Sequence, residues 1–252
     1  MSLKYEDFEC YVVHYTGHTK RKKFLLNQFN KEKIKVTFIE DYDREFVSYE
    51  EAYKNFDMSI WEYQKRSPTS FSPYLYPLKP AEISLCLKHK EAFRKFLVES
   101  KKEYLFLMED DVILCENFIH TLDNYLKTIP SDWNAAFIGQ GGGKRIEKSL
   151  IKKNIYWYHK DHPADRCTDS VLFKRTTVEK IYKGMVSRKI SFPLDHELSF
   201  WFRNFNMKIY WLEPPIVAQG SQTGYFESYQ DAISGQYEDK TIKMRMDMEK
   251  LL

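Results

Sequence analysis

Three consecutive carboxylates, Glu109-Asp110-Asp111, interrupt an apolar stretch that runs from Tyr104 to Leu114. Neighbouring carboxylates repel one another, and a divalent cation is the simplest partner that makes such crowding favourable. Mg²⁺ and Mn²⁺ take oxygen ligands and are often held by one or two carboxylates together with substrate phosphates. The triplet therefore predicts a site for Mn²⁺ or Mg²⁺ and a nucleotide diphosphate. The alternative is a solvated turn in which Asp110 or Asp111 caps the following helix.

The residues before the triplet, Tyr104 to Met108, predict the element that positions it. They are five apolar or aromatic residues without alternation, a pattern typical of a short strand buried on both faces of a largely parallel sheet. The three acids then leave this strand at its carboxyl end. Because open α/β sheets bind ligands at that end, the position favours a functional role over a capping role.

The first forty residues predict a strand over 9–15, a helix over 20–30 and a strand over 35–40, the opening of a nucleotide-binding α/β fold. Asp41, after the second strand, is placed to bond a ribose hydroxyl or to cap a turn. Arg21 lies in the first helical turn, where a basic side chain opposes the helix dipole and is better tolerated beside an anion. A solvated basic face is the alternative. No GxGxxG follows the first strand, so this is not a dinucleotide-binding fingerprint.

A longer helix begins at Pro80, a residue suited to the first helical position, and runs to Leu97. Glu82 and His89 share its apolar face. We expect His89 to be a core histidine bonded to a neighbour, and Glu82, near the helix start, to contact a ligand. Before it, residues 48–64 predict a helix, and the proline-containing residues 65–79 predict a long lid or binding loop.

Two later segments carry further polar side chains. Asp195 stands at the start of a predicted helix, which it is placed to cap. The following His196-Glu197 is not a zinc protease motif, because position 200 is Phe. Gln219 and Gln222 belong to a Gln-Gly-Ser-Gln turn whose donors suit a diphosphate or a sugar, although the same composition makes any loop.

The remaining elements follow from length and composition. We expect helices over 115–127 and 176–185, strands over 134–139, 154–158 and 208–212, and a docking helix over 238–252. A polar loop over 159–165 is placed to touch an acceptor. The segment Gln140-Gly141-Gly142-Gly143-Lys144-Arg145 lacks the P-loop spacing GxxxxGK(S/T), so a flexible surface loop is expected.

The composition excludes several classes of partner. The chain has 252 residues and a formal net charge of +3 with acids and bases interspersed, so nothing requires nucleic acid. Its four cysteines include no CxxC pair, which argues against a zinc site or a redox motif. The first residues lack the apolar core of a signal peptide and no run reaches membrane-spanning length, so a cytoplasmic protein is expected. The oligomeric state is left open.

Four stretches, in order along the chain, resemble glycosyltransferase family 25, which includes bacterial lipooligosaccharide β-galactosyltransferases and collagen galactosyltransferases. Tyr11 to Arg21 resembles the family's first strand and basic helix start. Pro80 to His89 is similar to its P-G-E-I-G-C-x-x-S-H signature. Glu109-Asp110-Asp111 matches its E-D-D, and Glu213 to Gln222 is similar to its E-P-x-x-x-x-Q-G-S-Q ending. The departures from the helix signature include Ala81, Ser84 and Lys88.

The resemblance implies an α/β, Rossmann-like fold of the GT-A type, with a mostly parallel central sheet flanked by helices. It implies one glycosyltransferase domain over 1–252, with a nucleotide-sugar half over 1–112, an acceptor half over 113–235 and a tail over 236–252. The implied reaction moves a hexose, with galactose expected, from a UDP-sugar to a saccharide hydroxyl with inversion. The expected product is lipooligosaccharide or another surface glycan, and a glycolipid acceptor would bring the protein to the inner face of the membrane.

The resemblance also implies roles for individual residues. The implied ligands of Mn²⁺ or Mg²⁺ are Asp111, Asp110 and Glu109. Asp195 is the first candidate for the general base that inversion requires, before Glu197 and Asp169. The implied contacts to the nucleotide-sugar are Thr16, Arg21, Asp41, Glu82 and Asp110. The implied contacts to the diphosphate or the acceptor are Gln219 and Gln222.

Two other functions stay open. A nucleotidyltransferase shares the sheet and the metal-binding acids, but should carry a loop rich in Gly and basic residues directly after the first strand, where only Thr16-Gly17 stands. A family member that binds glycans or nucleotides without catalysis would usually lose the metal carboxylates. This chain keeps all three.

Overall fold

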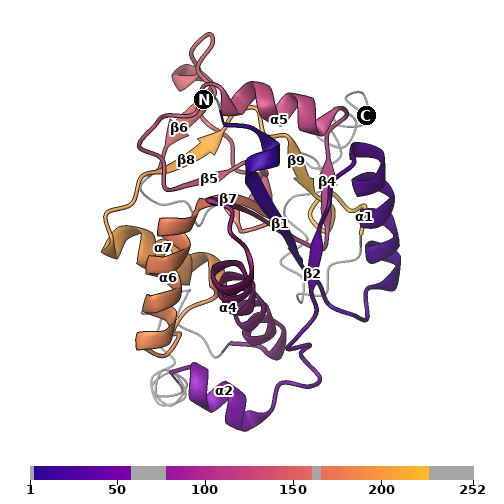
Figure 1. Cartoon of the computed structure of the whole chain (residues 1–252), viewed down its shortest axis with the longest axis vertical. Helices are drawn as coiled ribbons and strands as arrows, with labels where there is room; N and C mark the ends of the chain where they lie inside the picture. Colours follow the sequence, from indigo (N-terminus) through magenta and orange to yellow (C-terminus); the bar gives the residue numbers. More distant parts are fainter. Residues whose placement is uncertain (1–2, 58–77, 161–165, 227–252) are drawn as a thin grey trace.

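The computed structural model describes residues 3–57, 78–160 and 166–226. Its centre is a seven-stranded sheet in the order β2-β1-β3-β7-β5-β8-β6, and a two-stranded sheet joins β4 to β9 (Figure 1). The strands are β1 (Phe8–Val13), β2 (Thr37–Ile39), β3 (Tyr104–Glu109), β4 (Val112–Leu114), β5 (Ala135–Phe137), β6 (Trp157–His159), β7 (Ser170–Lys174), β8 (Ile209–Leu212) and β9 (Val217–Gln219).

Five of the seven strands point the same way. β1 pairs in parallel with β2 and β3, and β5 pairs in parallel with β8. β7 lies between β3 and β5 and is antiparallel to both, so β5 and β8 share the direction of β1. β6 is antiparallel to β8 at the edge. The expected α/β fold with a mostly parallel sheet is confirmed, with β7 as an inserted antiparallel strand.

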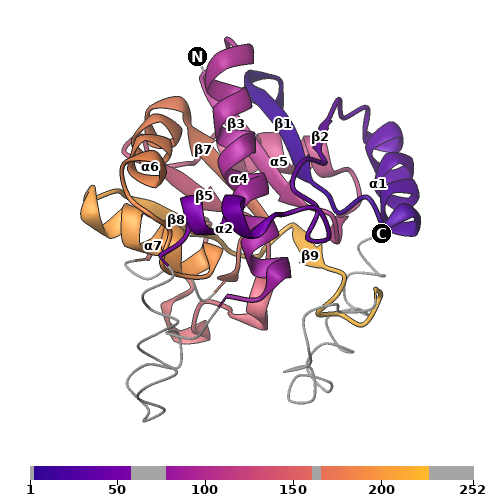
Figure 2. The same ribbon diagram turned by 90° about the horizontal axis from the view of Figure 1, so that it is seen from below.

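Helices cover both faces of the sheet. The helices are α1 (Thr19–Glu32), α2 (Tyr49–Asn55), α4 (Pro80–Glu99), α5 (Phe118–Leu126), α6 (Arg175–Ser187) and α7 (Leu194–Asn204). Leu105 and Leu107 of β3 pack in one core with α4, α6 and α7. Phe106 and Met108, the alternate residues, pack in a second core with α1 and α5. Both views place α6 and α7 together, on the side opposite to α1 (Figures 1 and 2).

The predicted helix start at Pro80 is confirmed. The Glu82 carboxylate accepts from the Lys79 backbone N–H at 2.8 Å, which satisfies one of the free N–H groups at the helix start. His89 is buried in the core, with Nδ1 3.0 Å from the Leu85 carbonyl oxygen. The expectation of a core histidine bonded to a neighbour is therefore also confirmed. Burial lowers the pKa of His89 to about 4.

The chain after the acid triplet differs from the prediction. Residues 112–114 form the strand β4, which pairs with β9. β9 itself lies in the segment after Leu212 for which no strand was predicted. The next helix, α5, therefore begins at Phe118, three residues later than expected. The cause is a pairing between segments far apart in the chain, which local composition cannot show.

Several predictions lie outside the described residues: the end of the helix over 48–64, the lid loop up to residue 77, residues 161–165 of the polar loop, and the tail. Both predicted halves contribute strands to the central sheet, and the division of the chain into those halves stays a prediction. Within residues 3–57, 78–160 and 166–226, no helix has the length and apolar character needed to cross a membrane.

Candidate active site

A cleft of about 200 Å³ opens at the carboxyl ends of β1 and β3. It lies at the edge of the sheet where an open α/β fold binds ligands. Half of the predicted site residues line it: Arg21, Glu109, Asp110, Asp111, Gln219 and Gln222. The structure thus brings the acid triplet together with the Gln-Gly-Ser-Gln turn and the start of α1.

Asp110 has both carboxylate oxygens engaged. Oδ1 accepts from the Arg21 guanidinium at 2.8 Å. Oδ2 lies 3.0 Å from Nδ1 of His14 and 3.0 Å from Nδ1 of His18, and accepts from the Tyr15 backbone N–H at 3.1 Å. Burial by itself would raise the pKa of Asp110, but the two histidines and the Arg21 charge lower it well below its usual range. Asp110 therefore holds the start of α1 against the end of β3.

Asp111 has only one oxygen engaged. Oδ2 accepts from the Ser221 hydroxyl, and the Asp111 carbonyl accepts from the Gly220 N–H at 2.6 Å. Within the described part of the chain, neither Oδ1 of Asp111 nor Oε1 of Gln219 has a hydrogen-bond partner, although both atoms are buried. Burial and the charge of Asp110 raise the pKa of Asp111. A buried oxygen without a donor is unfavourable unless a positive group binds beside it.

Two more carboxylates surround Asp111. The Glu109 carboxylate accepts from the Thr168 hydroxyl at 2.6 Å, and burial together with the charge of Asp111 raises its pKa well above the usual range. Asp169 is fully enclosed and accepts from the Gly141 N–H at 3.2 Å. Burial, together with the charge of Asp111, raises the pKa of Asp169 to about 7. The hydrogen-bond donors of these acids are neutral groups, so the ionised forms of the acids are poorly stabilised by the protein.

These oxygens fit a hard divalent cation. Among residues 3–57, 78–160 and 166–226, no three His, Cys, Asp or Glu side chains form a complete metal site by themselves. Mg²⁺ and Mn²⁺ need fewer protein ligands when substrate phosphates supply the others. The unpaired oxygens of Asp111 and Gln219, both lining the cleft, suit such a shared site.

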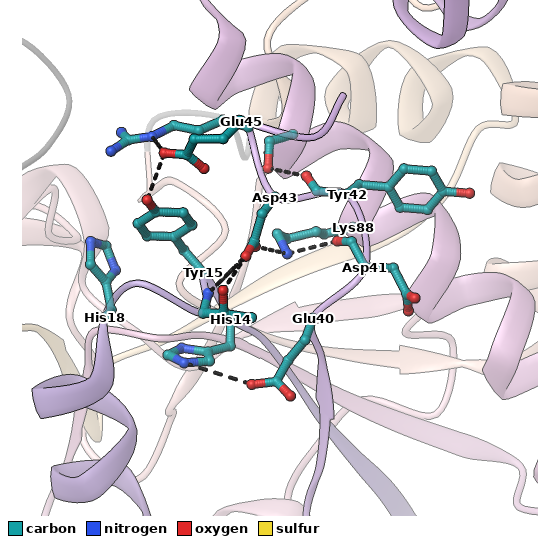
Figure 3. Close-up of polar contacts among 12 residues, drawn as sticks. His14, Tyr15, His18, Glu40, Asp41, Tyr42, Asp43, Glu45 and Lys88 are labelled. Carbon is teal, nitrogen blue, oxygen red and sulfur yellow. Dashed lines mark hydrogen bonds and ion pairs between the residues drawn. The ribbon is translucent and has the colours of Figure 1, made fainter. Parts of the chain in front are cut away.

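The hydrogen-bond network around Asp43, after β2, was not predicted from the sequence (Figure 3). Asp43 is buried and accepts from the Lys88 ammonium at 2.7 Å and from both the backbone N–H and the hydroxyl of Thr16. Lys88, at one of the departures from the family signature, also donates to the Asp41 carbonyl at 2.7 Å. Ser84, another departure, donates to the Tyr42 carbonyl at 2.6 Å. The predicted contact Thr16 is thus held in place by Asp43.

Asp41 does not reach the cleft. Its carboxylate is exposed and lies 3.2 Å from the Lys95 ammonium, on the outside of α4. Tyr42 has a positive φ of 63°, which turns the chain between Asp41 and Asp43. The acid that faces inward at the end of β2 is therefore Asp43, two residues after the one that the strand end indicated.

Three other predicted residues lie outside the cleft lining. Glu82 caps α4, as described above. Glu197 is buried in an ion pair with Arg188 at 2.8 Å and accepts from the Trp201 indole at 2.8 Å. Asp195 is only partly buried, in the first turn of α7, and its charge acts on the Cys167 thiol. Cys167 in turn contacts Gln222, which lines the cleft, whereas Asp195 is not among the lining residues.

The glycine segment is not the surface loop that its composition indicated. Gln140 and Gly141 are buried, and Gly141–Gly143 form a turn of 3-10 helix. The Gly141 and Gly142 N–H groups donate to Asp169 and Gln222. The segment therefore contacts two predicted site residues directly.

A comparison with known protein families gives a match. Residues 8–183 match glycosyltransferase family 25, described as an LPS biosynthesis protein. That match spans more than half of the chain. No curated protein matches the chain.

Three solved structures are distantly similar. A protein from STIV has 12% identity, 81% coverage of both chains and a TM-score of 0.43. A Drosophila β-1,4-galactosyltransferase 7 mutant, in complex with manganese, UDP-Gal and xylobiose, has 8% identity, covers 92% of this chain and 78% of its own, and has a TM-score of 0.42. The 4-diphosphocytidyl-2C-methyl-D-erythritol synthase from Anaerococcus prevotii has 12% identity, 97% coverage of both chains and a TM-score of 0.39. Similarities at these TM-scores carry no weight for function.

Proposed function

Because the chain belongs to glycosyltransferase family 25, we propose that it is a metal-dependent, inverting hexosyltransferase that uses a UDP-sugar. Glycosyltransferase activity follows from the family. The finer proposal adds galactose as the sugar, a saccharide hydroxyl as the acceptor and a surface glycan such as lipooligosaccharide as the product. One observation carries it: among the described residues, two buried oxygens without donors belong to Asp111 and Gln219, which line a cleft at the carboxyl edge of the sheet.

The metal proposal rests on those two oxygens. Asp111 Oδ1 and Gln219 Oε1 would hold Mn²⁺ or Mg²⁺ together with the diphosphate of the donor. Bound there, the ion supplies positive charge beside the UDP that departs. Glu109 and Asp110 stay predictions as ligands, and Asp110 already has four donors in the protein.

The side of the cleft proposed for the UDP-sugar has basic side chains and a loop that is held by hydrogen bonds. Arg21 donates to Asp110 and lines the cleft, where its guanidinium suits a phosphate oxygen. The Asp43–Lys88 pair holds Thr16 and the end of β2, and so shapes the nucleoside end of the cleft. We therefore place the nucleotide along β1 and α1.

Inversion by direct displacement needs a general base beside the acceptor. The acceptor oxygen bonds to the anomeric carbon, the bond from that carbon to the UDP oxygen breaks, and the base takes the hydroxyl proton. Among the three predicted candidates, Asp195 alone is partly exposed, whereas Glu197 is paired with Arg188 and Asp169 is enclosed. Burial raises the pKa of Asp195, which makes it a stronger base than a solvated aspartate. We propose Asp195 as this base.

The experiment that tests the proposal is UDP release from a panel of UDP-sugars in Mn²⁺ and in EDTA. We expect release from UDP-galactose in Mn²⁺ and a loss of roughly 1000-fold in Asp111→Asn or EDTA, since the charge on departing UDP then goes unmatched. Glu116→Gln, which removes an exposed acid near the triplet, is the matched control and should retain full activity.

The same assay separates the alternatives. Pyrophosphate release from a nucleoside triphosphate, with no UDP release from any sugar donor, would identify a nucleotidyltransferase and overturn the proposal. Stabilisation by UDP without turnover of any donor would indicate a binding member of the family. Incorporation of the sugar into a glycolipid acceptor in vesicles would test the proposed membrane association.

A further inference from the structure

Arg166 is a fully buried arginine that the proposed mechanism does not use. It donates to the carbonyls of Lys144 at 3.0 Å, Leu212 at 2.7 Å and Gly139 at 3.4 Å, and to the Glu213 carboxylate at 2.8 Å. Burying a guanidinium is unfavourable unless its donors are satisfied, and here several different segments satisfy them. Arg166 therefore joins both ends of the glycine segment, 139–144, to the end of β8.

Glu213 completes this clamp. It accepts from the Arg145 guanidinium and from the Ile146 backbone N–H at 3.2 Å, in addition to Arg166. Glu213 also begins the family-like ending that contains Gln222. The two ends of the glycine segment are thus fixed by one buried ion pair.

The glycines are needed because the segment lies directly on its neighbours. A Cβ atom at Gly139 would lie 1.8 Å from Asp169 Oδ2, and one at Gly141 would lie 2.2 Å from the Arg166 carbonyl oxygen. The N–H groups of Gly141, Gly142 and Gly143 are all engaged, by Asp169, Gln222 and the Gln140 carbonyl. None of these three N–H groups is left for a phosphate, so the segment positions side chains instead of binding an anion.

The side chain that it positions in the cleft is Gln222. A backbone N–H can only donate, so the Gln222 atom facing Gly142 is the oxygen Oε1. The amide nitrogen Nε2 is then turned towards Cys167, whose sulfur lies 3.6 Å away and is a weak acceptor. Nε2 carries two N–H groups and Gln222 lines the cleft, so one strong donor is directed to a bound molecule.

We propose that Arg166 is a positioning residue for the transfer reaction. Through the glycine segment it fixes the Gln222 amide so that an N–H of Nε2 donates to an oxygen of the bound UDP-sugar. This inference rests on the proposed function, because it takes a UDP-sugar as the occupant of the cleft. The oxygen belongs either to the diphosphate or to the sugar, and the two sources are separated below.

The first test is independent of activity and measures hydrogen exchange at the Gly142 amide. We expect exchange to be about 10-fold faster in Gln222→Ala, which removes the acceptor, and in Arg166→Lys, which keeps the charge but loses most of the carbonyl contacts. The control is Arg175→Lys, because Arg175 likewise donates to the carbonyls of Lys102 and Ser100 at 2.8 and 2.7 Å, at the other end of β7. An unchanged Gly142 rate in Arg166→Lys would overturn the inference. If Arg166→Lys does not fold, Glu213→Gln takes its place with the same expectation.

The second test is a double-mutant cycle on transfer. We expect Gln222→Ala and Arg166→Lys each to raise KM for the donor about 10-fold, and the double variant to be no worse than either, since both remove one contact. Additive effects would contradict a positioning role. UDP alone should bind Gln222→Ala more weakly if the oxygen is on the diphosphate, and equally well if it is on the sugar. Absence of UDP release by the wild type would defeat the proposed function, while the exchange test would still decide the role of Arg166.

Discussion

The two sides of the cleft balance charge in opposite ways. On the side of β1 and α1, Asp110 has four donors and Asp43 is paired with the Lys88 ammonium. On the side of β9 and β7, the carboxylates of Glu109 and Asp169 lie around Asp111 with neutral donors such as Thr168, Ser221 and Gly141. Adjacent residues of one triplet therefore meet different surroundings.

The difference indicates what each side does. The side of β1 and α1 pairs the carboxylates of Asp110 and Asp43 with charged and backbone donors, which suits a rigid wall. The side of β9 has buried oxygens that lack partners within the described part of the chain, together with carboxyl groups of raised pKa, which suits a place completed by a cation and a diphosphate. The same kind of substitution, aspartate to asparagine, should therefore change stability differently on the two sides of the cleft.

The largest expected difference concerns Asp110. Asp110→Asn leaves Arg21 buried beside a neutral amide, and removal of one partner of a buried ion pair typically lowers the free energy of unfolding by about 3 kcal/mol. Urea denaturation measures this, with Glu116→Gln as the exposed control, expected within about 0.5 kcal/mol of the wild type. A loss below about 1 kcal/mol would mean that the wall does not depend on this pair.

The second prediction is a pH dependence that belongs to Asp169. Its pKa is about 7 in the folded protein against 3.8 for a free aspartate, so the folded state keeps a proton that the unfolded chain releases. The stability from this proton is fully present below the unfolded pKa and is lost as the pH rises towards 7. As the pH rises between these two pKa values in EDTA, the free energy of unfolding of the wild type should fall. Relative to the wild type, Asp169→Asn should become more stable by an amount on the order of 2 kcal/mol. Parallel curves for the two proteins would show that Asp169 is ionised throughout.

The third prediction concerns Asp111 without metal. Because Asp111 accepts from the Ser221 hydroxyl, a neutral donor, and lies beside the charge of Asp110, Asp111→Asn should change the free energy of unfolding by less than about 1 kcal/mol in EDTA. The wild type should be stabilised by UDP with Mn²⁺, and the variant should not. Thermal unfolding with and without UDP and Mn²⁺ measures both effects. A large loss of stability in Asp111→Asn without metal would mean that Asp111 stabilises the fold, as Asp110 does.

The smallest expected effect is at the surface of the wall. Tyr15 donates its hydroxyl to Glu45 at 2.6 Å in an exposed position. Exposed polar pairs contribute little, so Tyr15→Phe should lower the free energy of unfolding by less than about 0.5 kcal/mol. Urea denaturation would detect a larger loss, which would extend the tightly held wall to this exposed pair.

Local patterns in the sequence were enough for the parts of the fold with local causes. The apolar run before Glu109 predicted β3, and Pro80 predicted the start of α4, because burial and capping act over a few residues. The sequence did not predict that Asp43 is the acid that faces inward, because the direction of its side chain depends on the backbone turn at Tyr42. Neighbouring acids at a strand end are equivalent until that turn is known.

Long-range contacts account for the other differences. Nothing in the composition of residues 112–114 and 217–219 shows that they pair, or that Arg166 reaches Glu213. The glycine segment looked like a surface loop because three glycines fit any loop, and only the closeness of Asp169 explains them. The functions of Asp195, Glu197 and Asp169 stay predictions, since placement alone does not assign a base.

The pairing of β4 with β9 has a consequence for the timing of synthesis. Ser221 and Asp111 are 110 residues apart, so the acids of the triplet leave the ribosome long before the strand that completes their site. A nascent chain that ends before β9 would have β1, β2 and β3 available for pairing, but neither Gln219 nor Ser221 beside Asp111. We therefore expect ribosome-bound chains of increasing length to acquire UDP binding in Mn²⁺ only after β9 has emerged. UDP binding would then depend on the synthesis of β9, although the acids of the triplet had been made much earlier.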